Sequence, residues 1–136
     1  GDKLSVLLLV ETDKPGPAAL EAAHTLAMQI AASNPIAVSR EDVPAAVLER
    51  ERKVAMEIAR QSAKDEKFLG KIAEGQLAKF FKEAVLLDQE YIRDPKLSVG
   101  KWLDSLRGEL GKVTVRSFVR YQLAEELASE TSGEAA

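Results

Sequence analysis

The sequence predicts an α+β fold, in which three strands form one antiparallel sheet and helices pack on one face of it. Three observations lead to this prediction. Strand-like segments lie near the start, in the middle and at the end of the chain, at residues 4–11, 84–91 and 113–123. Segments with a helical spacing of apolar residues separate these strands. The length of 136 residues suits one domain with a single core.

The first strand is expected at Leu4–Glu11, where leucine and valine dominate. Because Val6–Val10 is continuously apolar, we expect this strand to lie at the centre of the sheet. It ends at a cluster of turn-forming residues, Asp13–Pro17. A helix follows over Ala18–Ala32 and stops before Pro35, since proline cannot continue a helix.

Two further helices are predicted in the middle of the chain. The first begins after Ser39–Asp42, which is typical of a helix start, and continues to Ser62. The second covers Asp65–Lys82, with leucine, isoleucine and phenylalanine at helical spacing. Residues Ala84–Tyr91 are expected to form the second strand, which ends before Pro95.

The last part of the chain predicts a short helix, the third strand and a tail. Ser98 can cap the helix, which ends near Gly108 or Gly111. The domain is expected to span residues 1–128. Small polar residues over 129–136 predict a disordered tail.

The third strand, Val113–Leu123, alternates between apolar and polar residues. One face is expected to carry Val113, Val115, Val119 and Tyr121, and the other Arg116 and Arg120. The two arginines lie beside Phe118, so this face is either a partner-binding patch or an ordinary solvated surface.

Composition excludes several classes of function. Lys and Arg number 19 against 22 Asp and Glu, and the net charge of −3 speaks against DNA or RNA binding. Cysteine is absent and His24 is the one histidine, so thiol chemistry, cysteine zinc sites and His-rich metal sites are excluded. Val6–Val10 is far shorter than the roughly 20 apolar residues of a membrane span. The sequence contains no phosphate loop or hydrolase motif, and predicts neither an enzyme nor a bound metal or cofactor.

Several strings of residues follow one another as they do in a known protein family. The string Leu26–Pro35 is similar to that family's helix end, I-A-M-H-I-A-A-x-N-P, and Phe118–Tyr121 to its closing F-V-R-Y. On these strings the chain resembles elongation factor Ts, the guanine-nucleotide exchange factor of the translation factor Tu. The strings cover nearly the whole chain and are Leu8–Asp13, Leu26–Pro35, Val38–Ala45, Lys71–Leu77, Lys79–Glu83, Leu86–Gln89 and Phe118–Tyr121.

The resemblance implies a function without covalent chemistry. A Ts protein binds elongation factor Tu, disturbs its Mg²⁺ and phosphate region and speeds the loss of GDP, so exchange factor and nucleotide weaken each other's binding. The family's T-D-F-V turn presses into Tu, and Thr12, Asp13, Lys14 and Pro15 occupy its place here. Further partner contacts are implied at the helix end and the last strand, at Gln29, Ile30, Ser33, Asn34, Arg116, Phe118 and Arg120.

The turn departs from the family pattern in a way that leaves two functions open. Lys14 stands in place of the phenylalanine, Pro15 in place of the valine, and the loop is shorter. An aromatic ring is a rigid apolar wedge, whereas lysine is flexible and strongly hydrated. The chain is therefore either a working exchange factor or a degenerate, weakly active Ts domain. The latter would serve as a scaffold module of a longer, ribosome-associated chloroplast polyprotein.

The remaining expectations concern surroundings and assembly. The resemblance implies the bacterial cytoplasm, with the chloroplast stroma as the alternative. The chain opens directly into a strand, which suggests a domain of a longer protein. A homodimer is expected through a strand face, either Val115, Val119 and Tyr121 or the opposite Arg116, Phe118 and Arg120.

Overall fold

A computed structural model describes residues 3–62 and 65–122 of the chain. The expected tail at 129–136 lies outside the described residues. The chain divides into two compact units. Unit 1 consists of residues 1–34 and 103–136, and unit 2 of residues 35–102. The chain passes from unit 2 back to unit 1 within helix α4, Val99–Ser105.

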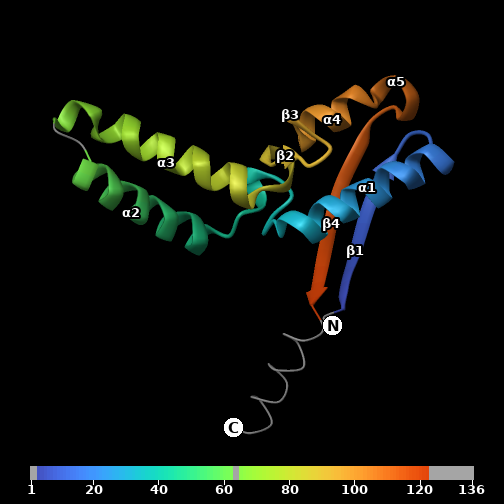
Figure 1. The fold of residues 1–136 in the computed structure, drawn as a ribbon, viewed down its shortest axis with the longest axis horizontal. Coiled ribbons are helices and arrows are strands. Elements are labelled where there is room, and N and C mark those ends of the chain that lie inside the picture. The colour runs from blue at the N-terminus through green and yellow to red at the C-terminus, as the bar shows by residue number, and fades with distance from the viewer. Residues whose placement is uncertain (1–2, 63–64, 123–136) are drawn as a thin grey trace, which may run out of the picture. The chain divides into compact units, whose positions relative to one another are not determined.

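Unit 1 is a long antiparallel strand pair with a helix beside it (Figure 1). Its elements are β1 (Leu4–Thr12), α1 (Pro17–Ser33), α5 (Arg107–Leu110) and β4 (Val113–Gln122). The predicted first helix is confirmed. Pro17 lies in its first turn, and Asn34 ends it in the left-handed conformation with φ 45°. The Asn34 amide donates to the Ile30 carbonyl at 2.9 Å, which satisfies one of the last carbonyls of the helix.

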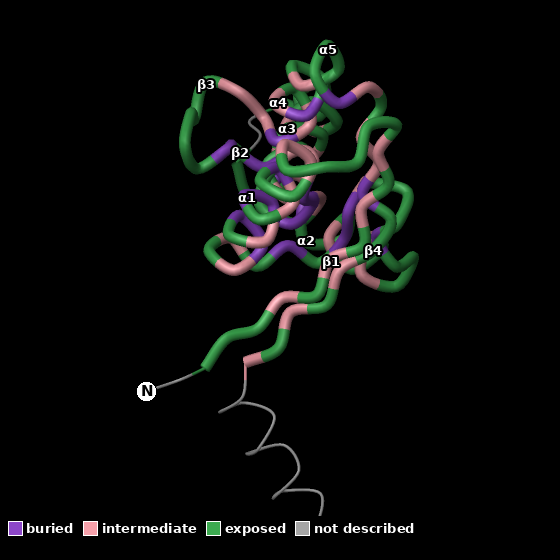
Figure 2. The backbone as a smooth tube through the Cα atoms, turned by 90° about the vertical axis from the view of Figure 1, so that its right-hand side faces the viewer, coloured by how far each residue is buried: buried purple, intermediate pink, exposed green. Residues whose placement is uncertain are grey.

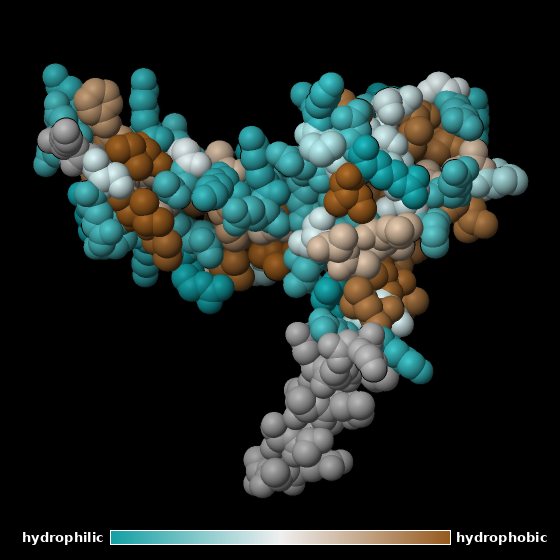
Figure 3. All heavy atoms as spheres, viewed as in Figure 1, coloured by the Kyte–Doolittle hydropathy of each residue, from teal (hydrophilic) through white to brown (hydrophobic). Residues whose placement is uncertain are grey.

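Unit 2 is mainly helical. Its elements are the 3₁₀ turns η1 (Arg40–Asp42), η2 (Glu66–Phe68) and η3 (Leu86–Asp88), the helices α2 (Ala45–Ser62) and α3 (Leu69–Ala84), and the strands β2 (Glu90–Tyr91) and β3 (Asp94–Ser98). Helices α2 and α3 run side by side, and hydrophobic side chains follow this pair between hydrophilic ones (Figures 1 and 3). The core at their base contains Ala37, Val43 and Val85, with Phe80 and Phe81 packed against it.

The predicted three-stranded sheet is wrong. In the described residues β1 pairs with β4 and β2 pairs with β3, so the chain forms two separate two-stranded sheets. Most of Ala84–Tyr91 is not a strand, because Ala84 ends α3 and Leu86–Asp88 is a 3₁₀ turn. Val85 and Leu86 are fully buried. A short buried apolar run looks like a strand in the sequence even where it joins two helical segments.

The expectation that β1 lies buried at the centre of a sheet is also wrong. Leu7 and Leu9 are 65% and 57% exposed, and exposed residues alternate with half-buried ones along β1 and much of β4 (Figure 2). The reason is that β1 has one partner strand and α1 covers only one of its faces. The prediction of helices on one side of a sheet is confirmed for this strand pair.

A β-bulge in β4 corrects the predicted strand faces. Leu9 lies opposite Ser117, whereas Val10 lies opposite Val115, so Arg116 is an extra residue. One extra residue reverses the alternation of side chains beyond it. Val115 is therefore buried while Val119 and Tyr121 are exposed, and Phe118 and Arg120 lie on the half-buried side instead of beside Arg116.

Candidate partner-binding site

The predicted turn, Thr12–Pro15, is at the end of β1, and side chains of the turn hold it in place. Thr12 Oγ1 donates to the Leu110 carbonyl at 2.9 Å and accepts from the Lys14 amide at 3.3 Å. The Lys112 amide donates to Asp13 Oδ2 at 2.9 Å. Asp13, Lys14 and Pro15 are exposed. The turn thus presents a carboxylate to solvent, with Asp13 anchored through one of its two oxygens.

The predicted helix-end residues divide between the interior and the surface. Gln29 and Ile30 are 2% and 0% exposed, so other parts of the chain cover them. Gln29 Nε2 donates to Ser33 Oγ at 3.1 Å, one helical turn further along α1. Asn34 is exposed and Ser33 is half-buried. Of these four residues, Ser33 and Asn34 are thus the ones with accessible side chains, and Gln29 and Ile30 belong to the interior.

Arg116 lies on the exposed face of the strand pair. Its Nη2 donates to Glu11 Oε2 at 2.8 Å, and both side chains are more than half exposed. The hydrogen bond from Arg116 lowers the pKa of Glu11 below its ordinary value of 4.5, and charge attraction adds to this effect. The same bond, followed by the same attraction, raises the pKa of Arg116. Arg116 is already paired within the chain.

Phe118 and Arg120 lie on the half-buried face of β4. Arg120 Nη2 donates to the Ala31 carbonyl at 3.3 Å, which places a cation at the C-terminal end of α1. A positive charge is favourable there because the helix dipole is negative at that end. Arg120 Nε is buried and has no hydrogen bond to the described residues. Arg120 therefore joins the last strand to the helix end.

The structure assembles most of the predicted residues into two separate groups and leaves Arg116, on the exposed strand face, outside both. Thr12 pairs with Val113 at one end of the ladder, and Val6 pairs with Arg120 toward the other end. The two pairs are six residue steps apart along β1, a distance of about 20 Å. The turn is thus one group, and Arg120 with the end of α1 is the other.

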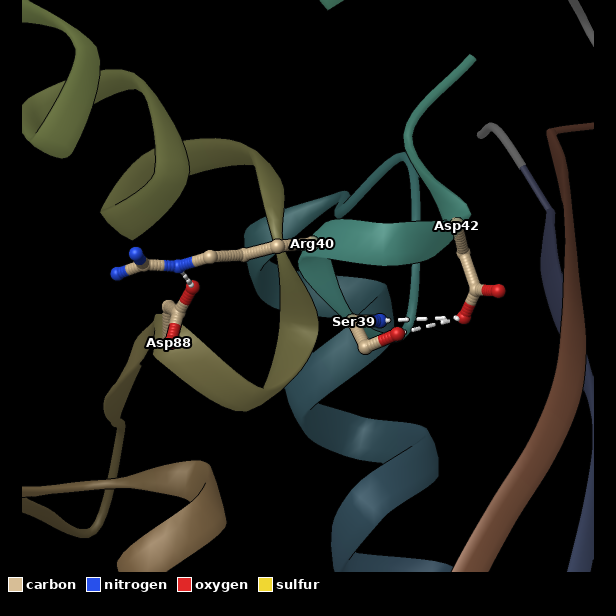
Figure 4. Close-up of polar contacts among 4 residues, drawn as sticks. All are labelled: Ser39, Arg40, Asp42 and Asp88. Atoms are coloured by element: carbon tan, nitrogen blue, oxygen red, sulfur yellow. Dashed lines mark hydrogen bonds and ion pairs between the residues drawn. The ribbon is translucent and has the colours of Figure 1, made fainter. Parts of the chain in front are cut away.

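Unit 2 contains a polar cluster in which the predicted helix start, Ser39–Asp42, meets Asp88, a contact that was not predicted from the sequence (Figure 4). Arg40 Nε contacts Asp88 Oδ2 at 2.8 Å, and the Arg40 guanidinium lies 4.7 Å from the centre of the Phe81 ring. The Ser39 amide and hydroxyl both donate to Asp42 Oδ2, at 3.3 and 2.9 Å. These residues belong to three different family-like strings. Their shared likeness to the family was the one sign in the sequence that the three segments could meet. The cluster ties η1 to the end of α3 and to η3, so its role is to hold unit 2 together.

Two surface hollows of unit 2 are lined by residues outside the predicted site set. One of about 600 Å³ follows α2 and is lined by Leu48, Arg52 and Met56, among others. Another of about 290 Å³ lies between α2 and α3, lined in part by Val54 and Phe80. Among the helices that the structure describes, none combines the length and the apolar character needed to cross a membrane.

Comparison with known proteins identifies the family. Residues 1–125 match the family model described as elongation factor TS. The chain is 45% identical to elongation factor Ts of Nitratidesulfovibrio vulgaris (strain DP4), over 97% of this chain and 48% of that protein. It is 38% identical to elongation factor Ts of Bartonella henselae, over 98% of this chain and 44% of that protein. It is 47% identical to elongation factor Ts of Thermobifida fusca, over 87% of this chain and 40% of that protein. The chain spans about half the length of these relatives, and it belongs to the elongation factor Ts family.

Proposed function

We propose that this chain binds elongation factor Tu and promotes the release of GDP from it. The observation that carries the proposal is the turn Thr12–Pro15, in which Asp13, Lys14 and Pro15 are exposed. The resemblance implies that this turn stands in the place of the family's T-D-F-V turn, and the chain belongs to that family. The binding requires no covalent chemistry. A carboxylate brought near the Mg²⁺ and phosphates of Tu disturbs their charge balance, and GDP then binds more weakly.

The geometry of Asp13 supports this role. Oδ2 accepts the hydrogen bond of the Lys112 amide, and Oδ1 makes no hydrogen bond to the residues that the structure describes. One oxygen is thus available to a partner while the other fixes the side chain. Fixing the side chain beforehand lowers the entropy that is lost when the partner binds.

The test is stopped-flow release of a fluorescent GDP from elongation factor Tu, with and without the chain. Asp13→Asn keeps an oxygen that can accept from Lys112 but removes the charge, and we expect it to slow GDP release about tenfold. Asp94→Asn is the matched control, because Asp94 is also exposed and accepts a backbone hydrogen bond, from Lys96 at 3.2 Å. Equal rates for the wild-type chain and Asp13→Asn contradict the role of the charge. No acceleration by the wild-type chain contradicts the proposed function.

A working translation factor is favoured over a scaffold module of a chloroplast polyprotein. The relatives named above come from bacteria and carry the name elongation factor Ts. The proposed place of action is accordingly the bacterial cytoplasm, where the partner functions. The replacement of the aromatic wedge by Lys14 supports a rate of exchange below that of a family member with the intact turn.

We also propose that a second copy of the chain covers the exposed face of the strand pair. This face carries Leu7, Leu9, Val119 and Tyr121, all exposed. Its charged residues Glu11 and Arg116 neutralise each other, so two copies can stack without repulsion between like charges. Light scattering at high concentration should give twice the 14.8 kDa of one chain. Leu7→Glu should abolish the pairing and Leu20→Glu, at an exposed leucine of α1, should not.

A further inference from the structure

A second segment of the chain, Leu110–Lys112, lies against the Thr12–Asp13 turn. The two segments are separated by 98 residues in the sequence, yet three hydrogen bonds join them. Thr12 Oγ1 donates to the Leu110 carbonyl at 2.9 Å, and the Lys112 amide donates to Asp13 Oδ2 at 2.9 Å. The Asp13 amide also donates to the Lys112 carbonyl, at 3.4 Å. Both ends of this segment therefore bind the turn.

Gly111, between these two ends, has a conformation and surroundings that only glycine fits. Its φ is +70°, where residues with a side chain are strained. A β-carbon at this position would lie 2.8 Å from both Cβ and Oδ2 of Asp13. The Asp13 side chain thus occupies the space that a side chain at Gly111 would need. The close approach of the two segments depends on the missing side chain.

The remaining contacts make Leu110–Lys112 a firm support. Leu110 is 2% exposed and its amide donates to the Leu106 carbonyl at 2.8 Å. The Gly111 amide donates to the Arg107 carbonyl at 2.8 Å, which closes α5. Val113 follows directly and pairs with Thr12 in the strand ladder. The exposed turn is therefore fixed against an anchored backbone.

We infer that Leu110–Lys112 positions the Thr12–Pro15 turn for its contact with elongation factor Tu. Gly111 is the positioning residue, because its missing side chain leaves room for the Asp13 side chain. This inference rests on the proposed function, because it assigns a purpose to the support of the same turn. A displacement of about 1 Å in a reacting or binding group is enough to reduce rates by up to about a hundredfold. A side chain at Gly111 produces a displacement of that order, since a contact of 2.8 Å must open to an ordinary one.

The experiment compares Gly111→Ala with Gly108→Ala. Gly108 lies in α5, the helix that Gly111 caps, and a β-carbon at Gly108 meets no atom within 4 Å. We expect Gly111→Ala to lower the maximal rate of GDP release at saturating chain at least tenfold, with the half-saturating concentration changed less than about threefold. Gly108→Ala should behave as the wild-type chain does. Wild-type rates in a folded Gly111→Ala chain overturn the inference.

A second pair of variants covers the case in which Gly111→Ala does not fold. Thr12→Val removes both hydrogen bonds of the hydroxyl, the one to the Leu110 carbonyl and the one from the Lys14 amide, at nearly constant shape. Thr12→Ser keeps the hydroxyl. The inference requires slower GDP release with Thr12→Val and recovery with Thr12→Ser. Equal rates for the two variants overturn it.

A spectroscopic measurement separates this inference from the proposed function. The Lys112 amide proton resonance reports the hydrogen bond to Asp13 without any partner present. It should move in Gly111→Ala and in Asp13→Ala, and stay unchanged in Gly108→Ala. If the wild-type chain does not accelerate GDP release, the proposed function fails, and the positioning role of Leu110–Lys112 fails with it. If the wild-type chain is active and the resonance does not move, only the positioning role fails.

Discussion

Among the residues that the structure describes, the two ion pairs with the shortest contacts differ in their surroundings. Arg116–Glu11 in unit 1 and Arg40–Asp88 in unit 2 both have a nitrogen–oxygen distance of 2.8 Å. The first lies on a strand face with both side chains more than half exposed. In the second Asp88 is only 28% exposed, and the guanidinium also lies over the Phe81 ring. The distance between two charges therefore does not decide what they contribute, because solvent screening and neighbouring groups do.

The difference extends to the two units that hold these pairs. In unit 2, the family-like strings meet at a buried core and at the Arg40 cluster, so they maintain the fold. In unit 1, the string that ends at Asp13 forms an exposed turn supported by Leu110–Lys112. Substitutions around the Arg40 cluster should therefore reduce stability, and substitutions in the turn should change activity toward the partner.

The largest effect is expected from Leu86→Ala, which truncates a fully buried side chain of unit 2. Leu86 is fully buried, so the variant loses apolar contacts and leaves a cavity, at a cost of about 2–5 kcal/mol in the free energy of unfolding. Urea unfolding measures this cost. Leu20→Ala is the control, because Leu20 is 72% exposed and its loss should cost less than about 0.5 kcal/mol. Equal unfolding midpoints for the two variants would show that unit 2 does not depend on this side chain.

The next effect concerns the turn of unit 1 and should appear in activity alone. Lys14→Phe, with the loop restored to the family length, supplies the rigid aromatic group that the turn lacks. An aromatic anchor at an interface contributes about 2 kcal/mol, so GDP release should become about 30-fold faster. Lys14→Phe alone should gain less, because Pro15 and the short loop aim the ring differently. If the unmodified chain already releases GDP as fast as a family member with the intact turn, Lys14 does not reduce the exchange activity.

A smaller effect is expected from Arg40→Gln. The variant loses both the ion pair with Asp88 and the contact with the Phe81 ring, together about 1 kcal/mol in the free energy of unfolding. A double-mutant cycle with Asp88→Asn isolates the ion-pair part. If the changes in unfolding free energy of the two substitutions are additive, the ion pair contributes nothing to stability, although Asp88 is largely shielded from solvent.

The smallest effect is expected from Arg116→Gln, which removes the exposed pair of the comparison. Because Arg116 lowers the pKa of Glu11 in the folded chain, the pair stabilises the fold above pH 4.5, the ordinary glutamate value. This contribution is lost as the pH falls through the lowered pKa. Carboxyl ¹³C NMR should show the Glu11 midpoint rising in Arg116→Gln and unchanged in Arg107→Gln. If the Glu11 titration midpoint is the same in Arg116→Gln as in the wild-type chain, the ion pair does not stabilise unit 1.

Local sequence signals predicted the helices well. Pro17–Ser33 and Ala45–Ser62 lie within a few residues of the predicted ranges, since apolar spacing and prolines act over one or two turns. Ser98 caps α4 as predicted, and its Oγ accepts from the Lys101 amide at 3.2 Å. The residues of the candidate turn were also identified from the sequence, because a short linear string carries the resemblance. Their support by Leu110–Lys112 was not, since it joins segments 98 residues apart.

Burial and strand pairing depended on tertiary structure. An apolar strand such as Leu4–Thr12 can be buried or half exposed, depending on how many strands and helices pack against it. The local sequence does not reveal how many neighbours the strand will have. The apolar run Ala84–Leu87 could form a strand or a buried connection between helical segments. In the structure Val85 makes an isolated parallel β-bridge to Ala37, while Ala84 ends α3 and Leu86 begins a 3₁₀ turn. The single extra residue at Arg116 reversed which side of β4 faces α1, because side chains alternate strictly with each residue added. Helix positions thus followed from the sequence itself, whereas the exposed faces and the anchoring of the turn arose only when distant segments packed together.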